Sequence, residues 1–200
     1  MQDKSSRPYH HGDLRRVVIE TAQDMLREEK GWQFTLREVA RRAGVSHAAP
    51  YKHFPEKSAL LAELAALGFD QLRSEIAGAL ERPLRSARAE FIAAAKAYIH
   101  FGTTNPSLYR LMFSGDVDKT AHAKLEEASA GAFAELLAIL ERGQVGEAFK
   151  KQPVHGQAAA AWALVHGLTM LAIDGQLLPQ KVGAKPIDAA LTSMLEGLET

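Results

Sequence analysis

Four side chains that donate hydrogen bonds lie close together near the end of the first quarter of the chain. Tyr51, Lys52 and His53 are consecutive, and Lys57 follows a few residues later. A phenol, an ammonium group and an imidazole can all donate to phosphate oxygens, and such contacts position a protein on duplex DNA. Small side chains nearby let a backbone approach base edges. The further candidates for contacts with double-stranded DNA are Thr35, Arg37, Ser46, His47, Ala48 and Ala49.

The helix before this segment is marked at both ends. Thr35, with Glu38 three residues later, has the spacing of a capping box, in which the two residues satisfy free N–H groups at a helix start. Gly44 predicts the end of that helix, because glycine readily adopts the left-handed conformation of a helix C-terminus. We therefore expect a helix, a glycine turn and a second helix.

The second helix is the expected recognition helix. It should cover about residues 47–53 with Ser46 as its cap, and it needs packing because so short a helix is unstable alone. Pro50 falls inside it and removes one backbone donor, so we expect a slight distortion. A third helix begins near Lys57, whose charge beside the free N–H groups of a helix start favours a phosphate.

The run from residue 35 to residue 60 resembles the helix-turn-helix of TetR/AcrR-type transcriptional regulators. The family pattern joins Thr-x-x-x-(Ile/Val)-Ala to Ala-Gly-Val-Ser and then to Tyr-x-His-Phe-x-x-Lys-x-x-Leu. Pro50 stands where the family often has a buried aliphatic residue. Two helices around a glycine also fit an ordinary αα-corner with a solvated charged face, but the length of the matching run favours DNA binding. The matching residues are Thr35, Val39, Ala40, Ala43, Gly44, Val45, Ser46, Tyr51, His53, Phe54, Lys57 and Leu60.

Composition limits the classes of function. The chain has 200 residues, no cysteine and zero net charge, yet residues 1–60 hold 11 Lys and Arg against 8 Asp and Glu, so the end with the predicted helix-turn-helix is basic. The absence of cysteine excludes disulfides, thiol catalysis and thiolate zinc sites. No apolar run has the length of a membrane span, and the N-terminus has no apolar signal core. We therefore expect a cytoplasmic protein without a membrane partner.

Helical periodicity runs through almost the whole chain, and no alternating run indicates a strand. We expect an all-α fold of about nine helices, with an N-terminal DNA-binding domain over residues 1–58 and a larger ligand-binding and dimerisation domain over residues 59–200. A first helix over about 13–29 completes a three-helix bundle with the helix-turn-helix, and a long helix over about 56–80 leads into the larger domain. Ahead of them, a segment with Arg7 is either a basic arm that contacts DNA or a solvated tail.

The larger domain contains aromatic and flexible apolar residues that are candidates for the wall of a ligand pocket, which needs apolar walls and a few polar groups. The same residues at helical spacing also fit a plain hydrophobic core. The candidates are Phe101, Tyr109, Met112, Phe113, Phe133, Trp162, His166 and Met170.

Within this set, Trp162 and His166 with Gly167 resemble the Trp-x-x-x-His-Gly element of a C-terminal domain in one TetR subfamily. Four residues apart, Trp162 and His166 share a helix face, where they line a cavity or stack at an interface. A buried, hydrogen-bonded histidine is the competing interpretation. No second ligand at metal-like spacing accompanies His166, so we expect neither a metal nor another cofactor.

An apolar stripe on the last predicted helix, together with small residues near position 160, is a candidate dimer seam. The resemblance implies a four-helix dimer interface there, whereas packing of the same stripe within one chain is the alternative. The candidate interface residues are Ala158, Ala161, Ile187, Leu191, Met194 and Leu198.

The resemblance implies a repressor that binds a palindromic operator as a homodimer, with recognition helices about 34–36 Å apart, and that a small-molecule effector releases. Two other classes compete with this interpretation. An all-α enzyme needs a catalytic constellation, and the sequence has no His-Glu-x-x-His, no phosphate loop and no acid pair at mechanistic spacing, so we expect no enzyme. The second competing class is a ligand-binding or protein-interaction module that keeps the pocket but does not bind DNA through its helix-turn-helix.

Overall fold

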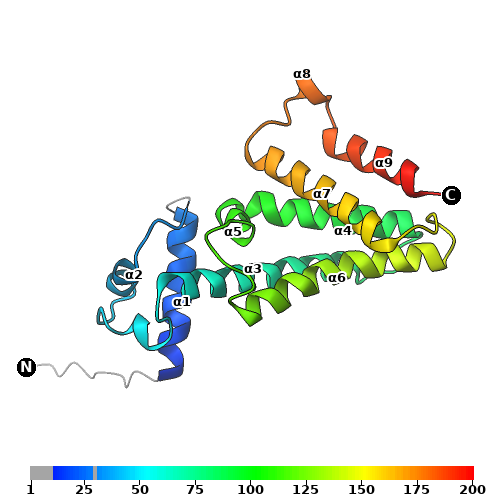
Figure 1. The fold of residues 1–200 in the computed structure, drawn as a ribbon. Coiled ribbons are helices and arrows are strands. Elements are labelled where there is room, and N and C mark those ends of the chain that lie inside the picture. The colour runs from blue at the N-terminus through cyan, green and yellow to red at the C-terminus, as the bar shows by residue number, and fades with distance from the viewer. Residues whose placement is uncertain (1–10, 29–30) are drawn as a thin grey trace, which may run out of the picture.

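The structure, a computed structural model, describes residues 11–28 and 31–200. Over these residues it is all-helical, which confirms the predicted fold class and the expectation of about nine helices (Figure 1). The predicted basic arm with Arg7 lies outside the described residues. The elements are α1 (His11–Glu28), α2 (Leu36–Arg42), the 3-10 helix η1 (Pro50–Lys52), α3 (Lys57–Leu80), α4 (Ala87–Thr104), α5 (Pro106–Met112), α6 (Ala123–Val145), α7 (Val154–Ile173), α8 (Pro179–Val182) and α9 (Pro186–Leu198).

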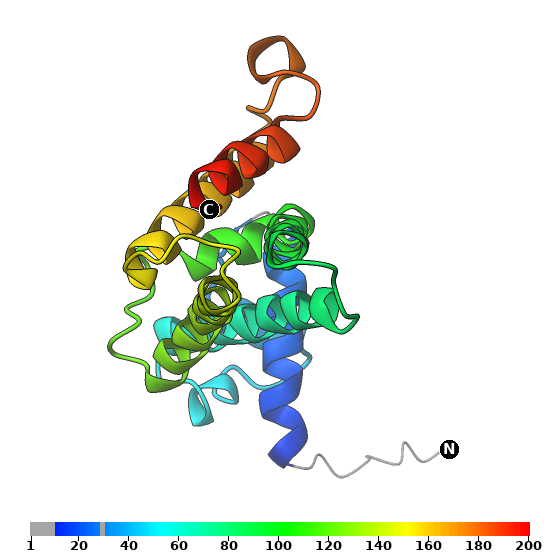
Figure 2. The ribbon, with the colours of Figure 1, turned by 90° about the vertical axis from the view of Figure 1, so that its right-hand side faces the viewer.

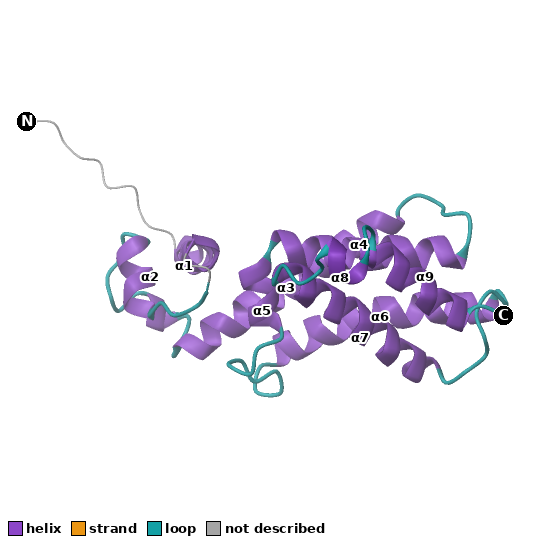
Figure 3. Ribbon diagram, turned by 90° about the horizontal axis from the view of Figure 1, so that it is seen from above, coloured by secondary structure: helices purple, strands orange, loops and turns teal. Residues whose placement is uncertain are grey.

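Two groups of helices share the helix α3. At one end α1, α2 and η1 pack against one another, and we call this group the head (Figure 1). The remaining helices form the body, in which α3 packs against α4, α5 and α6 (Figure 3). Leu60 and Leu64 near the start of α3 and Leu72 further along are all buried, so one continuous helix belongs to both groups.

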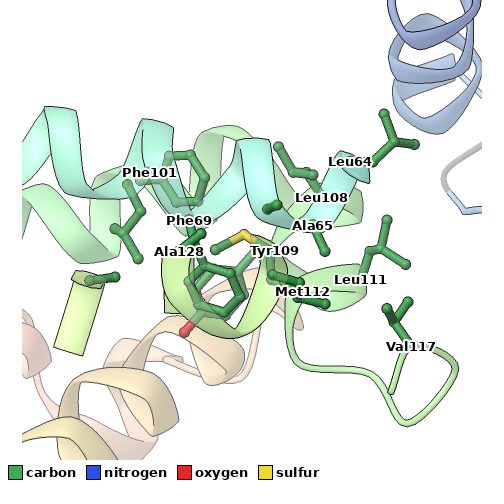
Figure 4. Packing of buried hydrophobic residues seen from close by; sticks show 14 of the residues in the cluster. Leu64, Ala65, Phe69, Phe101, Leu108, Tyr109, Leu111, Met112, Val117 and Ala128 are labelled. Atoms are coloured by element: carbon green, nitrogen blue, oxygen red, sulfur yellow. The ribbon is translucent and has the colours of Figure 1, made fainter. Parts of the chain in front are cut away.

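The body is tightly packed where α5 crosses α3. Tyr109 and Met112 of α5 are buried among Phe69 of α3 and Phe101 of α4 (Figure 4). Gly68 of α3 leaves the space that the Met112 side chain occupies, because a Cβ there would lie 2.7 Å from the Met112 sulfur. The short helix α5 is thus held directly against the helix that leads to the head.

The helix α7 is apolar on all sides, and α9 lies along it at the outer side of the body (Figure 2). Among the described helices, α7 alone is long and apolar enough to meet a length-and-composition test for a membrane span. It contacts α4, α6 and α9 of the body. Its alanines Ala158 and Ala161 are fully buried by these neighbours.

Candidate nucleic-acid interface and ligand cavity

The predicted capping box at the start of α2 is present. The Thr35 backbone N–H donates to Oε2 of Glu38 over 2.6 Å, and the Glu38 N–H donates to the Thr35 hydroxyl over 3.2 Å. Hydrogen bonds from the Thr35 backbone and hydroxyl lower the pKa of Glu38. Gly44 follows the helix with φ of 68°, the left-handed conformation that its position predicted. Both ends of α2 are therefore built as the sequence indicates.

The recognition segment differs from the predicted helix over about residues 47–53. It contains turns followed by the 3-10 helix Pro50–Lys52, which Ala49 rather than Ser46 precedes and which no side chain caps. Pro50 has no N–H to donate to the Ser46 carbonyl, and this carbonyl instead accepts from Ala49 over 2.9 Å. The next bonds, from Lys52 to Ala49 and from His53 to Pro50, also span three residues, which is the spacing of the tighter helix, and only the bond from Phe54 to Pro50 spans four. The recognition segment is therefore a short 3-10 helix rather than the slightly distorted helix that we expected.

The recognition segment still presents polar side chains outward. Tyr51 is 47% exposed, and Lys52 is exposed beside it. Ala49, in contrast, is only 8% exposed and belongs to the hydrophobic core, so its side chain does not face the surface as predicted. The other exposed candidates are Thr35, Arg37, Ser46, His47 and Ala48.

Two further candidate residues lie at the edge of the head. The Lys57 ammonium lies 5.6 Å from the centre of the Phe34 ring, at the first residue of α3. His53 is half-buried, and its Nε2 is buried without a hydrogen-bond partner among the described residues.

The body contains a cavity of about 390 Å³ between α3, α4, α6 and α7, within the range of small-molecule sites. Its wall is almost entirely apolar. The lining residues are Phe69, Leu72, Ile76, Phe91, Ala94, Ala95, Tyr98, Phe113, Lys119, Ser129, Ala130, Ala132, Phe133, Leu136, Ile139, Ala159, Trp162 and Val165.

Three of the eight predicted lining residues, Phe113, Phe133 and Trp162, line this cavity. Phe101 and Met112 are instead fully buried in the core, as the competing interpretation of each allowed. Met170 is half-buried and does not line the cavity. Periodicity indicates which side chains are buried, but not whether they face a neighbour or a void.

Tyr109 and His166 lie directly behind the cavity wall. The Tyr109 hydroxyl donates to the hydroxyl of Tyr98, which lines the cavity, over 2.9 Å, and it lies 2.7 Å from Nδ1 of His166. Burial raises the pKa of Tyr98 to about 12 and lowers that of His166, to which the charge of Lys119 also contributes. These three residues form a polar chain, so His166 is a hydrogen-bonded histidine beside the cavity.

The segment 113–124 runs from the end of α5 into the first turn of α6, and its side chains contact residues near the head. Trp32 donates through Nε1 to Oδ2 of Asp116 over 2.7 Å, which joins residues 84 positions apart. Close by, Glu63 of α3 pairs with Arg15 of α1 at 2.8 Å and with Lys124 of α6 at 2.6 Å. Burial acts to raise the pKa of Glu63, but the hydrogen bonds from Lys124 and Arg15 outweigh it and the pKa is lowered.

A capped helix, a left-handed glycine turn and an outward-facing recognition segment, carried on a helical body, define a helix-turn-helix DNA-binding protein. The family model "Bacterial regulatory proteins, tetR family" matches residues 21–64, and "Tetracyclin repressor-like, C-terminal domain" matches residues 91–198. The chain belongs to the TetR family and is a DNA-binding transcriptional regulator. Membership of this family implies a regulator rather than an enzyme.

Solved structures share this fold. A protein with unknown function from a Rhodococcus species is 34% identical, with a TM-score of 0.85 over 98% of this chain and 100% of its own. A TetR family transcription regulator from Marinobacter aquaeolei is 17% identical, with a TM-score of 0.67 over 94% of this chain and 96% of its own. The TetR family transcriptional regulator PfmR from Thermus thermophilus is 21% identical, with a TM-score of 0.66 over 88% of this chain and 97% of its own. A comparison with curated proteins finds no match.

Proposed function

We propose that this regulator is a repressor that binds a palindromic operator as a homodimer and that a small molecule in the body cavity releases it. Residues 1–58 would bind the DNA, and residues 59–200 would bind the effector and form the dimer. One observation carries the proposal. The continuous helix α3 packs against α1 of the head near its start and supplies three of the residues that line the cavity.

In this proposal the exposed polar side chains of the head contact the operator. Tyr51 and Lys52 would donate to phosphates, while the backbone beside Ala48 approaches the bases. His53 and Lys57 lie close enough in the chain to extend the same phosphate contacts. The proposed contact residues of the described head are Thr35, Arg37, Ser46, His47, Ala48, Tyr51, Lys52, His53 and Lys57.

The proposed dimer would use the outer sides of α7 and α9. Most of the predicted seam is already packed within one chain, because Ala158, Ala161, Leu191 and Leu198 are buried, while Ile187 and Met194 are half-buried. The uncovered side of α7 carries exposed alanines and Leu171, which is 44% exposed. A partner helix could cover this apolar side, which supports α7 and α9 as dimer elements through a different set of residues.

Effector release would act through the segment 113–124. This segment lines the cavity with Phe113 and Lys119, and it binds the head through Asp116. A ligand that shifts Lys119 would therefore disturb the contact with Trp32. Coupling between two such sites is typically about 1 to 3 kcal/mol, which would weaken operator binding about 5- to 150-fold.

The proposal is tested by selecting bound fragments from random DNA and measuring affinity by gel shift. Tyr51→Ala combined with Lys57→Ala should abolish specific binding, whereas Lys151→Ala, at an exposed position of the body, should not. Circular dichroism establishes that each variant remains helical. Selection of no fragment by a folded dimer, or full binding by the double variant, would overturn the proposal.

A further inference from the structure

Lys119 is the one charged side chain among the described residues that line the cavity. Its ammonium lies 4.9 Å from the centre of the Phe69 ring and 5.1 Å from that of Phe113, so it is placed over two aromatic faces. Aromatic faces attract a cation, but they do not neutralise its charge. Burial lowers the pKa of Lys119, which is the cost of removing an ammonium group from water.

The carboxylates closest to Lys119 in sequence are engaged elsewhere. Asp116 accepts a hydrogen bond from Trp32, and Asp118 accepts two from the backbone and hydroxyl of Thr120. Among the ion pairs of the described residues, none involves Lys119. Buried charges in proteins are normally paired, whereas within the described part of the chain this half-buried cation has no carboxylate partner.

The rest of the cavity divides by chemistry. Most lining side chains, such as Phe91, Leu136 and Ile139, offer nothing to a polar group, and Ser129 and Tyr98 carry the hydroxyls of the wall. The polar groups near Lys119 include the hydrogen-bonded chain that ends at His166, whose pKa the Lys119 charge lowers. The cavity is therefore a largely apolar space with a positive charge at one place on its wall.

We propose that the effector is an amphipathic monoanion, with an aliphatic or aromatic body that fills the apolar part of the cavity and a carboxylate that pairs with Lys119. The inference rests on the proposed function, since it assigns a ligand class to the cavity proposed there as the effector site. The carboxylate supplies the missing counter-charge, and a neutral or cationic molecule of the same shape does not. Binding would also shift the segment 113–124, which contains Lys119 and contacts Trp32 through Asp116. The carboxylate would therefore bind at the segment through which release is proposed to act.

Isothermal titration with matched ligands tests this assignment. The probes are octanoate, decanoate, dodecanoate and 4-phenylbutanoate, each compared with the alcohol and the amine of the same carbon skeleton at concentrations below micelle formation. A carboxylate paired with this half-buried ammonium should bind about 10- to 100-fold more tightly than its alcohol. Lys119→Met, which keeps an unbranched side chain of similar length, should remove this preference. Lys151→Met, the same change at an exposed position, should preserve it.

The preference for the carboxylate in the wild type, together with its loss in Lys119→Met, supports the assignment. Binding of no carboxylate, equal binding of the alcohols, tighter binding of the amines, or an unchanged preference in Lys119→Met overturns it. Thermal melting checks that the variant is folded, and Lys119→Gln, also neutral, provides a second variant with the same expected loss.

Gel shift with the selected operator, carried out on the same samples, separates the two proposals. A protein that prefers carboxylates but binds no DNA overturns the proposed function and leaves the ligand class standing. A protein that binds its operator and is released by alcohols but not by carboxylates overturns the ligand class alone.

Discussion

The hydrogen bond between Trp32 and Asp116 offers a direct test of how the head is held on the body. Trp32→Phe keeps an aromatic ring but removes the N–H that donates over 2.7 Å. A hydrogen bond to a charged acceptor contributes about 1.5–3 kcal/mol, and the exposure of Asp116 places this one near or below the lower limit, at about 1 kcal/mol. Since the smaller ring also loses packing, a single variant does not isolate the bond.

A double-mutant cycle isolates it. Trp32→Phe, Asp116→Ala and the double variant are unfolded in urea at one protein concentration, because the stability of a dimer depends on concentration. We expect the two changes to be non-additive by about 1 kcal/mol in the free energy of unfolding. The surface pair Arg27 and Asp24 within α1 is the control, with an expected coupling of about 0.2–0.5 kcal/mol. Additivity within about 0.3 kcal/mol at Trp32 and Asp116 would refute the contact as an energetic link.

The same variants report on release. If the contact transmits the occupied state of the cavity, Trp32→Phe should reduce the decanoate-induced loss of operator affinity by about fivefold, the equivalent of about 1 kcal/mol. Asp24→Ala should leave that loss unchanged, because its contact lies within one helix of the head. An unchanged response in Trp32→Phe, measured by fluorescence anisotropy with a labelled operator, would show that release takes another route.

Four further results are expected. Gly44→Ala should destabilise the protein by about 1–2 kcal/mol in urea unfolding, because φ is 68° there; a cost near zero would argue against the left-handed turn. The pKa of Glu63 is lowered in the folded protein, so its stabilising effect is present above the ordinary pKa of a glutamate and is lost as pH falls through the pKa of the folded state. Glu63→Gln should therefore flatten the acid limb of a curve of stability against pH. For operator binding, log K against log salt should have a slope of about −7 if four cationic contacts per subunit form, and Lys52→Ala should make it shallower by about 2 per dimer; a slope near zero would contradict phosphate contact. Lys119→Met should raise the melting temperature of the ligand-free protein, whereas a lower one would indicate a paired lysine.

The sequence predicts the head well where local rules decide the structure. Thr35 and Glu38 specify a helix start through contacts three residues apart, and Gly44 specifies a left-handed turn through its missing Cβ. The recognition segment is different, because seven residues cannot form a stable helix alone and Pro50 removes a donor from the middle of them. Its final form depends on how the core holds the buried residues Ala49 and Pro50.

The residues that line the cavity are harder to predict than the head, because they depend on how distant segments pack. Phe133 and Phe101 both appear as apolar positions of amphipathic helices, yet one lines a void and the other is fully buried. Lys119 has no helical pattern at all, since it lies in a polar segment between α5 and α6. Its position over Phe69 and Phe113 follows from the path of that segment, which depends on the packing of the buried Val117.

The continuity of α3 limits how the head can respond to a ligand. The helix has 24 residues and no proline, and buried leucines follow it from the head into the body, so it is expected to move as one unit. A neutral ligand that fills the cavity contacts α3 through Phe69 and Leu72. An anion is expected also to attract Lys119 and thereby to shift the segment that binds Trp32. Anions should therefore release the operator more strongly than alcohols even at equal saturation of the cavity. This difference between anions and alcohols should vanish in Trp32→Phe, because in that variant the ligand can act on the head only through α3.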